Sequence, residues 1–155
     1  LLGLHPVSLD DAVGNIFMKT YIWPRLIRRK IGTRKTMSEP SPVRSALDQI
    51  KSQDHVLDAS LVSRGGMYIM GGPLKGIHRE TFAAMAAIIL GAAETTSTEL
   101  KDKLSQVTID LTEQTLILIG IGTKYLVTIL MDQEGDKGKV ADLARELMAN
   151  AESVI

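Results

Sequence analysis

The hydrophobic positions of residues 41–152 change period several times, which divides this part of the chain into helices and strands. Apolar residues three and four positions apart run from Val43 to Ile50, after Ser41-Pro42, which joins a capping hydroxyl to a proline at the first helical position. This pattern predicts a first helix that ends near Gln53. A second amphipathic stripe follows Gly138 and predicts the last helix; it consists of Val140, Leu143, Ala144, Leu147, Met148 and Ala151.

An alternation with period two begins at His55 and predicts a strand. One face of this strand is expected to hold Leu57, Ala59 and Leu61, and the other face Val56, Asp58, Ser60 and Val62. Gly65-Gly66 then provides the positive φ that a tight hairpin turn requires. Residues 67–70 are predicted to return as a second strand, which the Gly71-Gly72-Pro73 sequence ends.

Three further strands are predicted before the last helix. Residues 106–111 alternate and should have one buried face, whereas residues 116–121 and 125–131 are continuous apolar runs, typical of strands covered on both faces. Short links between the three favour an antiparallel meander. The predicted order is α-β-β-α-β-β-β-α, an α/β (α+β) sandwich whose five-stranded, mostly antiparallel sheet carries helices on both faces.

The central helix, predicted from about His78 to Leu100, has an unusual composition. Its part from Phe82 to Ala93 is apolar on every side and rich in small residues. A helix of this kind must be covered on more than one side, and its own sheet can cover only one. A second copy of the chain is the expected cover for the other side.

The first 36 residues differ from the rest in charge. They contain seven basic residues against Asp10 and Asp11, although the whole chain has equal numbers of basic and acidic residues. Basic residues near Tyr21 and Trp23 leave open a membrane-surface arm, a nucleic-acid arm or a transit peptide. The favoured interpretation is a leader, disordered or outside the working domain, because Met37 resembles a start before a helix cap. The working domain is then 37–155, with no nucleic-acid or membrane partner expected.

Catalytic and ligand-binding motifs in the sequence are incomplete. The glycines of residues 71–76 lack the Gly-Lys-Ser/Thr ending of a phosphate loop, and the acidic residues of 132–138 lack the glycine and the glutamate of a calcium loop. His5, His55 and His78 have no metal-ligand spacing, and the absence of cysteine excludes thiol chemistry and fits a cytoplasmic protein. We therefore expect a non-enzyme without a metal or cofactor, which works by binding.

Three segments resemble the roadblock (dynein light chain) domain family. Residues 56–66 resemble its first hairpin, residues 79–94 its small-residue central helix, and the strand pair 116–119 and 125–130 its central strands. The resemblance covers residues 41 to about 152 and extends to the order of the elements. It implies a roadblock-like, profilin-like fold.

The resemblance also implies dimers, either of this chain or with a paralogous roadblock protein. Central helices would pack antiparallel and the third strands would pair into one ten-stranded sheet. The helix residues expected at that interface are Ala84, Ala87, Ile88, Gly91 and Thr95. The edge-strand residues expected there are Gln106, Val107, Thr108, Ile109 and Asp110.

Members of the family bind small Ras-like GTPases, and its prokaryotic branch includes GTPase regulators. A non-catalytic dimer that regulates such a GTPase is therefore the first functional expectation. The alternative is a structural adaptor that joins larger assemblies and is indifferent to nucleotide. Arg64 and Arg79 are expected to be surface residues and not arginine fingers, so regulation would act through the GTPase's own switch elements.

Overall fold

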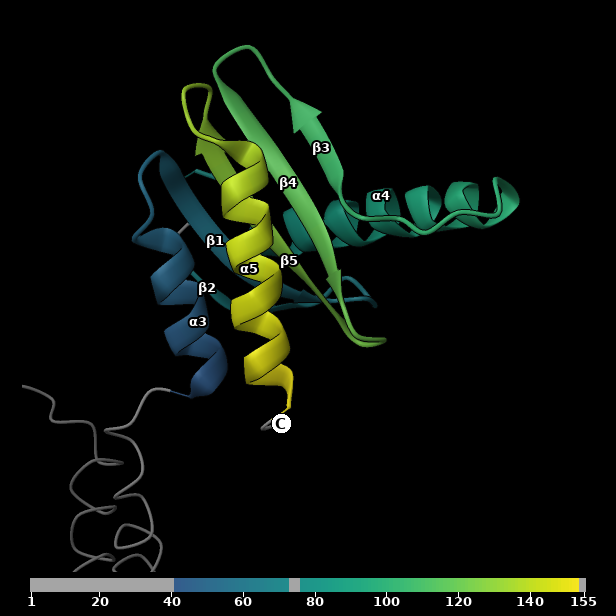
Figure 1. Ribbon diagram of the computed structural model, residues 1–155, viewed down its shortest axis with the longest axis horizontal. Coiled ribbons are helices and arrows are strands. Elements are labelled where there is room, and N and C mark those ends of the chain that lie inside the picture. The colour runs from purple at the N-terminus through teal and green to yellow at the C-terminus, as the bar shows by residue number, and fades with distance from the viewer. Residues whose placement is uncertain (1–40, 73–75, 154–155) are drawn as a thin grey trace, which may run out of the picture. The chain divides into compact units, whose positions relative to one another are not determined.

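The computed structural model describes residues 41–72 and 76–153, and Figure 1 labels their helices and strands. The order of these elements is the predicted one. In sequence order they are α3 (Pro42–Lys51), β1 (Val56–Ser63), β2 (Tyr68–Gly71), α4 (Arg79–Glu99), β3 (Val107–Asp110), β4 (Gln114–Ile121), β5 (Tyr125–Asp132) and α5 (Lys137–Glu152). The leader predicted over residues 1–36 lies outside the described residues, and its separate role stays a prediction.

The strands form one five-stranded sheet in the order β2-β1-β5-β4-β3, and every neighbouring pair is antiparallel. The three last strands form the predicted meander. The two long apolar strands β4 and β5 lie inside the sheet with β1, while β2 and β3 are its edges. This confirms the α/β sandwich and places the strand expected to pair with another copy at an edge.

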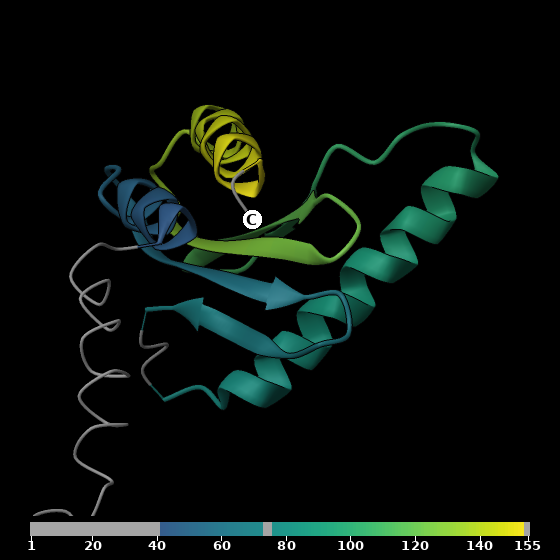
Figure 2. The ribbon, with the colours of Figure 1, turned by 90° about the horizontal axis from the view of Figure 1, so that it is seen from below.

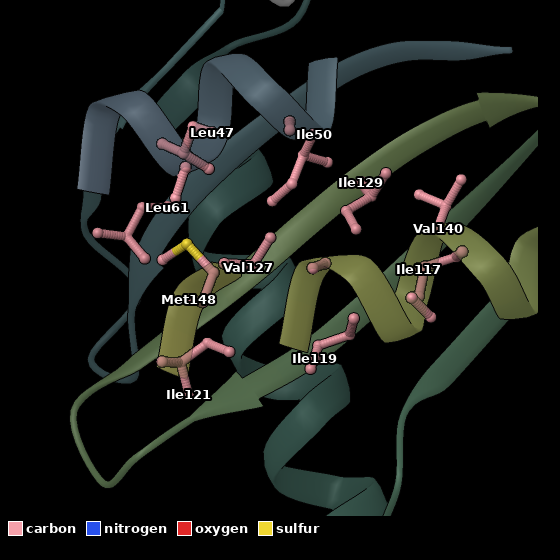
Figure 3. Close-up of a cluster of buried hydrophobic side chains, with 14 of the residues drawn as sticks. Leu47, Ile50, Leu61, Ile117, Ile119, Ile121, Val127, Ile129, Val140 and Met148 are labelled. Atoms are coloured by element: carbon pink, nitrogen blue, oxygen red, sulfur yellow. The ribbon is translucent and has the colours of Figure 1, made fainter. Parts of the chain in front are cut away.

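Helices cover both faces of the sheet (Figure 2). Helices α3 and α5 lie together on one face, where they enclose the larger core; Figure 3 shows Leu47, Ile50, Ile129 and Met148 within it. Helix α4 lies alone on the other face, over a smaller core that includes Leu90, Leu118 and Leu126. Two helices thus cover one face of the sheet, and one helix covers the other.

The helix ends follow the predicted capping chemistry. The hydroxyl of Ser41 accepts a hydrogen bond from the backbone N–H of Arg44 at 3.2 Å, with Pro42 at the first helical position. The carboxylate of Asp136 accepts from the N–H of Lys139 at 3.0 Å and caps α5. Part of the acidic sequence that resembles a calcium loop therefore begins a helix.

The strict alternation predicted for the first strand is wrong at its start. A register irregularity between Val56 and Asp58 shifts the pairing of β1 with β5, and Leu57 is 49% exposed instead of facing the core with Ala59. Val56 packs on the larger core in its place. A bulge inserts one unpaired residue, so it reverses the phase of the alternation on its two sides.

Candidate functional site

The outer face of α4 leaves large apolar side chains open to solvent. Met85 is 52% exposed and Ile88 is 61% exposed, although both belong to a helix whose inner residues Ala83, Ala86 and Leu90 are fully buried against the sheet. Single exposed apolar residues are common in proteins, but neighbouring ones on one helix face indicate a contact surface.

The structure separates the five helix residues that the sequence assigned to an interface. Ile88, Gly91 and Thr95 are exposed on the outer face, and Ala84 is half-buried at its margin. Ala87 instead packs against the smaller core. The sequence assignment missed Met85 and Ala92, which are exposed on the same side. The helical spacing of Met85, Ile88 and Ala92 contained that signal.

The C-terminal half of α4 extends past the sheet, as Figures 1 and 2 both show. Its hydroxyl side chains bond to the helix's own carbonyls: Thr95 to Gly91 at 2.9 Å, and Thr96 to Ala92 at 2.9 Å. These bonds keep the hydroxyls along the helix instead of directing them at a ligand. The surface of Gly91 is open. Apart from the backbone of its own helix and its chain neighbours, no heavy atom lies within 4 Å of the position that a Cβ would take there.

β3 provides a regular, unpaired sheet edge beside this helix. Its four residues pair with β4 in continuous register, from Val107 opposite Leu118 to Asp110 opposite Thr115. Val107 packs on the α4 side of the sheet, whereas the carboxylate of Asp110 bonds Lys137 of α5 on the other side. Gln106 and Leu111, predicted as strand residues, lie just outside β3, and Leu111 is 50% exposed.

The opposite edge, β2, is irregular. Its register with β1 shifts between Leu61 and Val62, and Ile69, which has no partner in that register, is 41% exposed. A bulge twists an edge away from a second strand and discourages pairing. Of the two sheet edges in the described chain, β3 is therefore the one suited to accept another strand.

Arg64, in the hairpin turn after β1, is held by other residues. Its guanidinium forms an ion pair with Glu94 of α4 and donates a hydrogen bond to the carbonyl oxygen of Gly122 at 3.0 Å. Its side chain is 27% exposed, so the expectation of a surface residue is only partly correct. Arg79 is exposed, and its guanidinium lies 5.3 Å from the centre of the Tyr68 ring.

A further pair of titratable groups lies at the other end of β1. His55 Nδ1 lies 3.0 Å from a carboxylate oxygen of Asp132, and this hydrogen bond raises the pKa of His55 and lowers that of Asp132. The described residues contain no group of three or more His, Cys, Asp or Glu side chains that could hold a metal ion. Residues 73–75 of the rejected phosphate-loop sequence are outside the described part.

None of the described helices is long and apolar enough to cross a lipid bilayer. In the part of the chain that the structure describes, an apolar helix face on α4 and a regular strand edge on β3 are both exposed. They lie on neighbouring elements, because the link 100–106 leads directly from α4 into β3.

The family model of the Roadblock/LC7 domain matches residues 43–131, more than half of the chain. No curated protein matches the sequence. Solved structures do: MglB of Myxococcus xanthus has a TM-score of 0.68 at 14% identity, over 76% of this chain and 99% of that one.

Two further structures extend the comparison. A Roadblock/LC7 domain from Streptomyces avermitilis has a TM-score of 0.64 at 16% identity, over 71% of this chain and 94% of that one. A profilin from Schizosaccharomyces pombe has a TM-score of 0.53 at 11% identity, over 71% and 96%. At these identities the structures establish a common fold, which this chain shares with roadblock domains and with a profilin.

Proposed function

Because the chain belongs to the Roadblock/LC7 domain family, we propose that it is a dimeric, non-catalytic module that regulates a small Ras-like GTPase. The observation that carries this proposal is the apolar outer face of α4 beside the regular free edge of β3. A dimer that pairs two β3 edges and packs two α4 helices would cover both features at once. The dimer could form with a second copy or with a paralogous roadblock protein.

The composition of α4 suits close helix packing. Gly91 and Thr95 are exposed one turn apart, with Ala84 and Ile88 on the turns before them. Small residues allow two helix backbones to approach, and the exposed surfaces of Met85 and Ile88 supply apolar area to bury. The part of α4 that extends past the sheet would then lie against the second copy instead of remaining in water.

The proposed regulation needs no catalytic group from this chain. Arg64 is occupied by Glu94 and Gly122, so a role as an arginine finger would first require breaking an ion pair and a hydrogen bond. We therefore propose that the dimer binds the GTPase and changes the position of the GTPase's switch elements. The cytoplasm, where such GTPases act, is the proposed location.

A test of dimer formation uses Gly91→Leu. A side chain at this position meets nothing in the single chain, and leucine favours a helix more than glycine does, so the fold should remain intact. We expect the variant to be a folded monomer by sedimentation equilibrium, where the unchanged chain is a dimer. An unchanged dimer mass for the variant would contradict packing through this face.

A test of the GTPase role is a pull-down from source-cell lysate, with the tagged chain and either a non-hydrolysable GTP analogue or GDP. We expect a Ras-like GTPase to be recovered mainly with one nucleotide, and its turnover to change when the chain is added. Recovery of other proteins equally with both nucleotides would contradict the regulator and favour a nucleotide-indifferent adaptor.

A further inference from the structure

The edge strand β3 has few contacts of its own to hold it in place. It is only four residues long and is hydrogen-bonded to another strand on one side only. The link before it comes from the part of α4 that extends past the sheet, and it passes through Lys101, whose φ is +56°. An edge of this kind frays unless side chains from another element hold its ends.

The N-terminal end of β3 is held by Arg145 of α5. One guanidinium nitrogen donates to the backbone carbonyl of Ser105 at 3.3 Å and to its hydroxyl at 2.9 Å, and also to the side-chain oxygen of Gln106 at 2.5 Å. Another nitrogen is bound to Asp142, which lies three residues earlier on the same helix. Arg145 is thus itself held while it binds the two residues that lead into the strand.

The C-terminal end of β3 is held by the start of the same helix. Lys137, the first residue of α5, forms an ion pair with Asp110, the last residue of the strand. The same carboxylate accepts a hydrogen bond from the hydroxyl of the buried Thr115 at 3.0 Å, and these two bonds lower the pKa of Asp110. Gln133, in the loop before α5, donates to the carbonyl oxygen of Leu111 just beyond.

We propose that Arg145 and Lys137 are positioning residues that keep the β3 edge straight and ready to pair with a second copy. The inference rests on the proposed function, since it assumes that β3 forms the strand pair of the dimer. The side chains of α5 that hydrogen-bond to β3 or to the residues just before it are these polar ones, whereas the apolar side of the helix faces the larger core. It can therefore align the edge without covering it.

The symmetry of the proposed strand pair places the two ends of β3 side by side at each junction. In an antiparallel pair of identical strands, the N-terminal end of one strand lies beside the C-terminal end of the other. Each junction would therefore bring the end held by Arg145 from one copy next to the end held by Lys137 from its partner. Loss of either contact should weaken association at both junctions, since each occurs twice in the dimer.

The experiment measures the dimer dissociation constant of the full chain by sedimentation, with Arg145→Lys as the main variant. Lysine keeps the charge but loses the forked donors of the guanidinium. We therefore expect the dimer dissociation constant to increase about tenfold or more. Lys139→Ala is the control, because Lys139 is exposed on the same helix and its side chain forms no hydrogen bond or ion pair within the described residues. The midpoint of thermal unfolding, measured at protein concentrations low enough that the dimer has dissociated, should be nearly unchanged in both variants.

The other end is tested by Lys137→Asp and by its charge-swapped rescue. Lys137→Asp should weaken the dimer by placing two carboxylates together, and the double variant D110K/K137D should restore most of the lost affinity. Equal dissociation constants for the unchanged chain and Arg145→Lys, or no rescue by the charge swap, would overturn the inference. A monomeric unchanged chain would instead overturn the proposed dimer, so the two failures are distinguishable.

Discussion

Gly72 is a residue at which a side chain would collide with its neighbours. A Cβ at this position would lie 2.0 Å from a carboxylate oxygen of Asp58 and 2.6 Å from Nζ of Lys51. Asp58 is 6% exposed and depends on Lys51, at 3.6 Å, and on the hydroxyl of Ser60, at 3.4 Å, for its contacts. The glycine therefore leaves room for an ion pair whose carboxylate is buried.

Replacement of Gly72 by alanine should displace that pair and lower the free energy of unfolding by about 1–3 kcal/mol, as overpacking of a buried site usually does. Urea denaturation measures the effect. Gly138→Ala is the matched control: it lies in α5, meets only a carboxylate oxygen at 3.6 Å, and should raise the stability by up to about 1 kcal/mol. A Gly72→Ala variant as stable as the control would contradict the described contacts.

The His55–Asp132 pair predicts a pH dependence of stability. Asp132 raises the pKa of His55 through its hydrogen bond and charge, so the pair stabilises the fold fully below the ordinary histidine value and loses this as pH rises through the raised pKa. At the acid end the contribution falls again as Asp132 takes up a proton. The useful window therefore lies between the lowered pKa of the aspartate and the raised pKa of the histidine.

His55→Asn tests this dependence, because asparagine tolerates the positive φ of +69° at this position. We expect the difference in unfolding free energy between the unchanged chain and the variant to be larger at about pH 5.5 than at about pH 8.5. Urea denaturation at both pH values gives the difference. An equal difference at the two pH values would show that the His55–Asp132 pair makes no pH-dependent contribution to stability.

At the scale of elements, the sequence predicted what local chemistry determines. The cap at Ser41, the long helix with its small residues, and the apolar runs of β4 and β5 all have direct signals in the chain. The bulges at Leu57 and Ile69 do not, because they arise from how strands twist against their neighbours. Residue patterns therefore gave the order of elements but not the exposure of these two residues.

The interface face of α4 was predictable only in part for a similar reason. An alanine-rich helix has no polar stripe to mark its outer side, so Ala87 and Ala84 could not be told apart until the sheet was in place. The contacts of Arg64 with Glu94 and of Arg145 with Ser105 were also not visible in the sequence, because these partners lie 30 and 40 residues away along the chain. Tertiary geometry decides such contacts.

The ion pair of Arg64 with Glu94 joins two elements, the first hairpin and α4. A double-mutant cycle with Arg64→Met and Glu94→Gln should give a coupling energy of about 0.5–1 kcal/mol, since the side chains are 27% and 37% exposed and water screens part of the attraction. Chemical denaturation of the four proteins supplies the values. Additive losses from the two single variants would mean that the pair contributes no coupling.

At the scale of the whole molecule, we propose that residues 37–155 fold without the leader. The described core is closed by α3, α4 and α5, all of which lie after residue 41. Deletion of residues 1–36 should therefore preserve one cooperative thermal transition, measured by circular dichroism at 222 nm, the usual helix wavelength. A broad transition without cooperativity would show that the domain needs the first segment.

The bulge in β2 has a consequence for how many copies can join. The described sheet has one regular edge and one irregular edge, so the proposed dimer has one edge per chain that suits strand pairing. When two β3 edges meet, both regular edges are used and only bulged ones remain at the outer ends of the joined sheet. In the proposed dimer, the irregularity at Ile69 would therefore discourage further strand pairing, so that the assembly ends as a closed pair and not as an open fibre.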